Sequence, residues 1–141
     1  MAAAGCAAVM LTMPVAAATA TCQKPRSGIR VTFSKDAYPH IIKHIKKSWK
    51  LGYPKVLKIN RDGADARRDA LLNQRLPSGE PKYPTKDGFD RDEAPAASLR
   101  KQTKADVEYV ESSENRSAGA SLGGQIRGYC DGTKVRYRFT T

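Results

Sequence analysis

Residues 89–93 concentrate negative charge, because Phe89, Asp90, Arg91, Asp92 and Glu93 place three carboxylates and one arginine in four consecutive positions. The chain as a whole carries a formal net charge of +11. Neighbouring carboxylates repel one another unless a cation or a proton-transfer role stabilises them. The fold must therefore place this acidic stretch where cations can reach it. A basic chain with one acidic focus predicts a polyanion held by the surrounding surface and a divalent metal held at the focus.

Hydrolysis of a phosphodiester is a reaction that suits these residue types. It requires a base to take a proton from water, a cation beside the phosphate and help for the leaving oxygen. Asp90, Asp92 and Glu93 offer carboxylates, and Arg91 or Arg116 can hold phosphate oxygens as a bidentate fork. The same cluster is also typical of a solvated turn or a Ca²⁺ site. The residues alone therefore favour catalysis without deciding it.

Residues 1–21 have the composition of a secretory signal peptide, and residues 22–141 are expected to form a single domain. Residues 1–20 carry no charged side chain and end in small residues. The usual positive amino-terminal region is missing, and a disordered alanine-rich tail is the alternative interpretation of the segment. The segment is too short and alanine-rich for a membrane anchor. We therefore expect a secreted, extracellular protein, monomeric and without stable membrane association.

Removal of the signal peptide would leave an even pair of cysteines. Cys6 departs with residues 1–21, so that Cys22 and Cys130 remain. In an oxidising compartment these two are expected to form a disulfide between the mature amino terminus and the last hairpin. A zinc site is not expected, because structural zinc requires four ligands at short spacings.

The excess of Lys and Arg is spread over most of the chain. A membrane-surface peptide would concentrate its charge on one amphipathic helix, and a cationic surface without a partner is the simplest alternative. Distributed cations match the phosphates of nucleic acid better. Arg67 and Arg68 lie on an expected helix and could face phosphates, or could belong to a solvated helix face beside Asp65 and Asp69.

Alternating and helical patterns predict an α+β fold. Strands are expected at residues 29–33, 56–59, 107–110 and 134–139. Helices are expected from Pro39 to about Gly52, over residues 64–73 and over residues 118–129. Three glycines in the last helix, Gly119, Gly123 and Gly124, lower its propensity and suggest close packing on a strand.

Two histidines, His40 and His44, stand four residues apart on the first expected helix. That spacing would let them share a helix face, as metal ligands do. No glutamate stands between them in the metalloprotease pattern. A surface or boundary position on a helix distant from the acidic stretch is the expectation for both.

Several stretches, in the same order along the chain, resemble the NucA/NucB type of secreted bacterial deoxyribonuclease. They are Ile59-Asn60-Arg61-Asp62-Gly63-Ala64-Asp65-x-Arg67-Arg68, Gly88-Phe89-Asp90-Arg91-Asp92-Glu93-x-Pro95, Ser113-Glu114-Asn115-Arg116-Ser117-Ala118-Gly119-Ala120, Gly124-Gln125 and Tyr129-x-Asp131-Gly132-Thr133. The resemblance implies a small, compact ββα-metal fold, with a short antiparallel sheet packed by helices. It also implies a metal-dependent endonuclease that hydrolyses DNA without sequence specificity.

The resemblance also implies roles for individual residues. The wider ββα-metal group has a histidine base, whereas this chain has Asp-Arg-Asp-Glu, so Asp92 or Glu93 is implied as the base and the other as its acidic partner. Glu93 occupies the histidine position of the motif, while Asp92 is shorter and stiffer. Asn115 matches a metal ligand, with Glu93 beside it, and Gln125 could orient a metal-bound water. Mg²⁺ or Mn²⁺ suits these oxygen donors.

Phosphate contacts to DNA are expected from four arginines, Arg61, Arg67, Arg68 and Arg116. DNA is the expected substrate, RNA is a second possible one, and a protein inhibitor is a further candidate partner. Two other hypotheses fit the charge. One is a secreted cationic nucleic-acid-binding protein without activity, and the other is a protein-binding or antimicrobial module.

Overall fold

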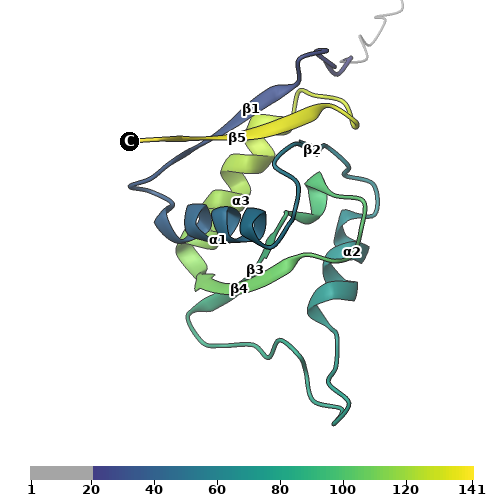
Figure 1. The fold of residues 1–141 in the computed structure, drawn as a ribbon, viewed down its shortest axis with the longest axis vertical. Helices are drawn as coiled ribbons and strands as arrows, with labels where there is room; N and C mark the ends of the chain where they lie inside the picture. The colour runs from purple at the N-terminus through teal and green to yellow at the C-terminus, as the bar shows by residue number, and fades with distance from the viewer. Residues whose placement is uncertain (1–20) are drawn as a thin grey trace, which may run out of the picture.

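Two β-sheets and three α-helices make up residues 21–141, the part of the chain that this computed structural model describes (Figure 1). The elements follow in the order β1 (Ile29–Ser34), α1 (Pro39–Lys50), β2 (Leu57–Lys58), α2 (Ala64–Leu72), β3 (Phe89–Ala94), the 3₁₀ helix η1 (Ala97–Leu99), β4 (Asp106–Glu111), α3 (Ser112–Ile126) and β5 (Lys134–Thr140). The predicted α+β class is confirmed. The predicted signal peptide lies outside the described residues apart from Thr21. Residues 21–141 contain no helix that is both long and apolar enough to cross a membrane.

The first and last strands lie side by side in a three-stranded sheet of order β1-β5-β2. β5 runs parallel to β1 and antiparallel to β2, so this sheet is mixed, while the expected short antiparallel sheet is formed by β3 and β4. The alternation along a strand shows which face is buried but not the direction of its neighbour. Val31, Phe33 and Val135 point inward and are buried.

A hairpin of β3 and β4 forms the second sheet, with Asp92 opposite Glu108. The chain passes directly from β4 into α3, which gives the ββα order that the resemblance implies. α3 begins at Ser112, six residues before the expected start. The structure offers no close contact to explain the glycines of α3, since a Cβ added at Gly119, Gly123 or Gly124 would meet nothing within 4 Å.

Helix α1 begins at Pro39 as predicted and packs an isoleucine face, Ile41, Ile42 and Ile45, into the main core. Its first N–H groups need acceptors from outside the helix. Glu114 of α3 supplies one, because its carboxylate accepts from the backbone of His40 at 2.8 Å and of Ile41 at 3.0 Å. A negative charge at this end of a helix is also favoured by the helix dipole. Glu114 thus joins α1 to α3 beside the hairpin.

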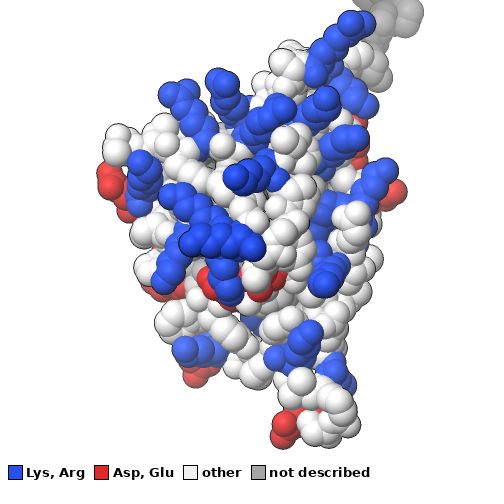
Figure 2. All heavy atoms as spheres, in the orientation of Figure 1, with Lys and Arg blue, Asp and Glu red and all other residues white. Residues whose placement is uncertain are grey.

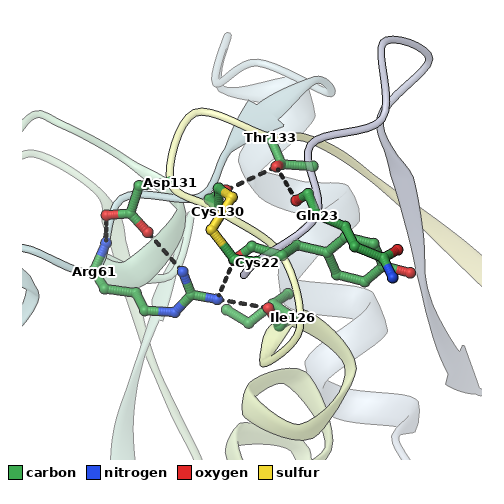
Figure 3. The surroundings of a disulfide bond; sticks show 8 residues. Cys22, Gln23, Arg61, Ile126, Cys130, Asp131 and Thr133 are labelled. Carbon is green, nitrogen blue, oxygen red and sulfur yellow. Dashed lines mark hydrogen bonds and ion pairs between the residues drawn. A yellow bond between two sulfur atoms is a disulfide. The ribbon is translucent and has the colours of Figure 1, made fainter. Parts of the chain in front are cut away.

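A disulfide joins Cys22 to Cys130, as predicted (Figure 3). The backbone next to it pairs as well, since the amide of Cys130 donates to Gln23 at 2.8 Å. Arg61 packs beside this loop, and its guanidinium donates to Asp131 at 2.6 Å and to the carbonyl of Ile126 at 2.5 Å (Figure 3). The amino-terminal segment is therefore attached to the turn that leads into β5.

We predict that replacing both Cys22 and Cys130 with serine lowers the free energy of unfolding. The bridge closes a loop across 108 positions, and a loop of that length corresponds to at most about 4 to 5 kcal/mol in the chain-entropy model. Urea denaturation of the oxidised protein and of the double variant measures the difference. Alkylation of unreduced protein followed by mass spectrometry provides the control, and two alkylated cysteines would contradict the prediction.

Candidate active site

Strand β3 divides the acidic stretch between its two faces, because successive side chains of a strand point to opposite sides. Asp90 and Asp92 point toward α1 and α3, where their partners are Arg116 and His44. Arg91 and Glu93 point the other way, toward α2 and the chain that follows β3. The four charged side chains therefore have two different sets of partners, although all four border the cavity described next.

A cavity of about 640 Å³ opens beside the first pair. It lies among β3, α1, α3 and the inward face of the three-stranded sheet. Its polar lining consists mainly of Arg61, Arg68, Asp90, Arg91, Asp92, Glu93, Asn115, Arg116 and Tyr137. Most of the predicted site residues thus border one space.

His44 holds Asp92 from the interior. Its side chain is 0% exposed, and Nδ1 lies 2.5 Å from Oδ2 of Asp92 while Nε2 lies 3.1 Å from Oδ2 of Asp106. Carboxylates only accept hydrogen bonds at neutral pH, so both ring nitrogens carry a proton when both contacts are made. The expectation of a surface or boundary position for His44, on a helix distant from the acidic stretch, is wrong.

The charge of the imidazole is stabilised by its surroundings. Burial by itself lowers the pKa of His44, but the hydrogen bond to Asp92 and the charges of three nearby carboxylates outweigh it, so the pKa is raised from 6.5. Lys47, one turn further along α1, bridges Asp106 at 2.9 Å and Glu108 at 2.7 Å. These contacts also raise the pKa of Lys47, chiefly through its hydrogen bond to Glu108. The result is a network that fixes α1 on the hairpin.

Glu93 occupies a different environment from Asp92. It is 5% exposed, and its carboxylate accepts from Arg68 at 3.0 Å, from the backbone of Ala97 at 3.3 Å and from Arg100. Burial lowers the pKa of Arg100, and the charge of Glu93 opposes that shift. A carboxylate enclosed by two arginines is poorly placed to take a proton or bind a metal, so the structure favours Asp92 over Glu93 as base.

Asp90 links the hairpin to the first turn of α3. Its carboxylate accepts from Ser112 at 2.8 Å and from the guanidinium of Arg116 at 2.9 and 3.2 Å. The bond from Arg116 is the main reason that the pKa of Asp90 is lowered, and the side chain of Asn115 lowers it further.

Asn115 does not cap α3. The helix begins three residues earlier, and its N-terminal cap residue, Glu111, makes no capping hydrogen bond through its side chain. Asn115 therefore has no role as the amino-terminal cap of α3. Its position one turn into α3 leaves its amide at the cavity wall.

The side chain of Gln125 binds the backbone of β1. Its side-chain oxygen accepts from the backbone N–H of Thr32 at 2.7 Å, and its nitrogen donates to the carbonyl of Thr32 at 2.9 Å. These two hydrogen bonds satisfy the backbone N–H and carbonyl of Thr32 at the edge of β1, and they hold α3 against that strand. The structure therefore does not support the metal-water role expected for Gln125.

The arginines expected to bind DNA differ in how many hydrogen bonds they already make within the protein. Arg67 donates to the carbonyls of Asn60, Asp62 and Ala97, and Arg61 is held by Asp131 and the disulfide loop. Arg91 likewise donates to two carbonyls, those of Leu72 and Tyr83. These three are positioned mainly as structural residues.

Two of the expected DNA-binding arginines keep an open surface at the cavity. The side chain of Arg68 is 54% exposed and that of Arg116 is 75% exposed, although each also contacts a carboxylate. Both line the cavity. They are the members of the expected set that a phosphate could reach with least rearrangement.

Sequence reasoning missed His44, Asp106 and Tyr137. His44 had a usable signal, because Ile41, His44, Ile45 and Ser48 are all buried and follow the spacing of one helix face. Tyr137 lines the cavity from β5, and burial and the charge of Asp92 raise the pKa of its hydroxyl. The alternation of residues 134–139 indicated that Tyr137 points inward, but not which other element its side chain would contact.

Within residues 21–141 no three His, Cys, Asp or Glu side chains gather as a metal cluster. Mg²⁺ and Mn²⁺ do not require one, because they retain several waters and need only one or two protein oxygens. The carbonyl of Asn115 and the neighbouring Asp90 are hard oxygen donors of this kind. The residues present therefore fit a largely hydrated divalent ion.

Comparison with known proteins identifies the family. No protein-family model matches the chain. The chain is 39% identical over 108 residues to the DNA-entry nuclease of Bacillus subtilis (strain 168), a match that covers 76% of this chain and 68% of that protein. The predicted resemblance is confirmed, and the chain belongs to the family of NucA-type nucleases.

Proposed function

We propose that this nuclease is a secreted, metal-dependent endonuclease that hydrolyses DNA without sequence specificity. The observation that carries the proposal is Asp92 at the cavity wall, with one carboxylate oxygen held by buried His44. The name of the relative supports DNA as the substrate. The disulfide and the composition of residues 1–21 support secretion, because disulfides persist in oxidising compartments.

Asp92 is the proposed general base. Its Oδ2 is engaged by His44, which leaves Oδ1 to accept a proton from water in the cavity. A base whose orientation is fixed by a second residue meets the geometric requirement of this kind of catalysis. Glu93 supports the strand from its opposite face.

Asn115 and Asp90 are the residues proposed to hold Mg²⁺ or Mn²⁺. A divalent ion bound there supplies a positive charge next to the scissile phosphate and lowers the pKa of coordinated water. Arg116 and Arg68, which line the same cavity, are proposed to hold phosphate oxygens. The phosphate backbone is common to all sequences, so these contacts carry no sequence preference.

Incubation of supercoiled plasmid with the purified protein tests the proposal. Cleavage in Mg²⁺ or Mn²⁺ and its loss with a chelator are expected, and a parallel assay on RNA determines substrate range. Plasmid that is bound but left intact under every metal condition would overturn the proposal in favour of a cationic binding protein.

We predict that Asp92→Asn lowers plasmid cleavage at least about 10²-fold, the scale of a lost acid–base group. The amide can still accept from His44, so the fold is expected to persist. Glu93→Gln is the matched control. It removes the charge opposite buried Arg100 and should lower thermal stability more than Asp92→Asn does, with a smaller effect on rate. Equal rates for Asp92→Asn and wild type would contradict the assignment.

We predict that Asn115→Ala raises the metal concentration needed for half-maximal cleavage. The reason is the loss of the amide oxygen proposed as a metal ligand. Metal titration of initial rates measures the shift. Gln125→Ala, which removes contacts to Thr32, should lower thermal stability and leave the metal titration unchanged. An unshifted titration for Asn115→Ala would mean that this residue only supports Asp90.

We predict that His44→Asn retains more activity than His44→Gln. The asparagine amide nitrogen lies near the position of Nδ1 and can still donate to Asp92, whereas the longer glutamine amide mimics Nε2 and its contact with Asp106. kcat measured at saturating metal, together with the melting temperature of each variant, separates positioning from folding. Equal kcat values at equal melting temperatures would show that the Asp92 contact has no part in the rate.

A further inference from the structure

The outward face of the three-stranded sheet carries only cationic and hydroxyl side chains. β5 contributes three exposed cations, and β1 and β2 contribute one each. The five residues, which we name the cationic sheet face, are Arg30, Lys58, Lys134, Arg136 and Arg138. Figure 2 shows Lys and Arg side chains crowded over the end of the molecule where Figure 1 places β1 and β5.

Like charges are placed next to one another on this face. Arg30 pairs with Arg136 in the register of β1 and β5, and Lys58 pairs with Lys134 in that of β2 and β5. Like charges directly opposite each other destabilise a sheet. Within residues 21–141 none of the five cations forms an ion pair with an acidic side chain. The fold thus leaves their charge for a partner outside the chain.

The cationic sheet face and the catalytic cavity lie on opposite sides of the same sheet. Phe33 and Tyr137 line the cavity from β1 and β5. Side chains alternate along a strand, so Arg136 and Arg138 point away from that cavity. A phosphate bound in the cavity cannot contact them at the same time.

The dimensions match a nucleic-acid backbone. Four residue steps separate Lys134 from Arg138, which corresponds to about 13 Å along the strand. One strand of duplex DNA presents a phosphate about every 3.4 Å of helix axis, so this length faces about four phosphates. The five exposed cations of the cationic sheet face are therefore comparable in number to the phosphates that they would face.

We propose that the cationic sheet face binds a second segment of double-stranded DNA, separate from the segment in the catalytic cavity. The proposal rests on the proposed function, since it concerns the same substrate. A second contact raises the local concentration of a long molecule at the cavity and leaves the chemical step unchanged. Its benefit is therefore confined to DNA that is long enough to reach both faces.

The double variant Arg136→Gln with Arg138→Gln tests this proposal. The matched control is Arg75→Gln with Lys82→Gln, which removes two exposed cations from the loop between α2 and β3. Figure 1 shows that loop at the opposite end of the molecule from β1 and β5. Both double variants lower the net charge by the same amount, so they differ only in where the positive charge is removed.

Two measurements are made on each protein. Binding of a kilobase-length duplex, followed as a function of salt, should weaken at least about fivefold in the sheet-face variant. The slope of log K against log salt should fall by about 1.8, at about 0.9 per lost phosphate contact. Cleavage of a duplex of ten base pairs should proceed at the wild-type rate in both doubles.

The outcomes separate the two proposals. Equal loss of long-duplex binding in both doubles would mean that net charge alone acts, and would overturn the inference. Unchanged binding in the sheet-face variant would overturn it as well, and binding of that face to anionic lipid vesicles but not to duplex would assign it to a membrane surface. If wild-type protein binds but cuts neither substrate, the proposed function fails while the binding comparison still stands.

Discussion

The packing of α1 on the β3–β4 hairpin depends on the buried imidazole of His44, which lies between two carboxylates of that hairpin. A buried charge is tolerated only when it is paired and hydrogen-bonded, and here Asp92 and Asp106 meet both ring nitrogens. Because the pKa of His44 is raised in the fold, this pairing contributes stability below pH 6.5. That contribution is lost as pH rises through the folded-state pKa. The same contact joins α1 to β3, so the fold and the candidate site share one interaction.

The two faces of β3 place the acidic residues in two different environments. On one face Asp90 and Asp92 contact Arg116 and His44 and border the cavity. On the other, Glu93 is enclosed by Arg68 and Arg100 and holds α2 and the segment after β3 in place. A strand is well suited to this division, because neighbouring residues acquire unlike surroundings within a single short motif. Asp90, Asp92 and Glu93 can therefore lie within four positions of the sequence and still have different charged partners.

The sequence was informative where a pattern is local. The strands at residues 29–33 and 134–139, the helix beginning at Pro39 and the Cys22–Cys130 disulfide were all predicted, because alternation, helical spacing and cysteine parity each act over short distances or by simple counting. The family motifs located the acidic stretch and Asn115 for the same reason. These signals require no knowledge of how the elements pack.

What escaped prediction depends on contacts between distant elements. The burial of His44 required knowledge that α1 lies on β3 and β4, and the parallel pairing of β1 with β5 joins residues about a hundred positions apart. Gln125 was assigned to a metal site because its motif position suggested it, whereas its partner is the backbone of Thr32. In each case the residue type allowed several roles, and the tertiary neighbour selected one.

The placement of β5 at the centre of its sheet governs when this nuclease can become complete during synthesis. β1 and β2 have no common partner until β5 lies between them, and Tyr137, which lines the cavity, belongs to that last strand. A chain emerging from its amino terminus therefore holds Asp92, His44 and Asn115 before it holds the sheet that backs them. The disulfide likewise can form only after Cys130 has been synthesised, because Cys130 is the partner of Cys22. The sheet that backs the cavity can therefore form only after β5 has been synthesised.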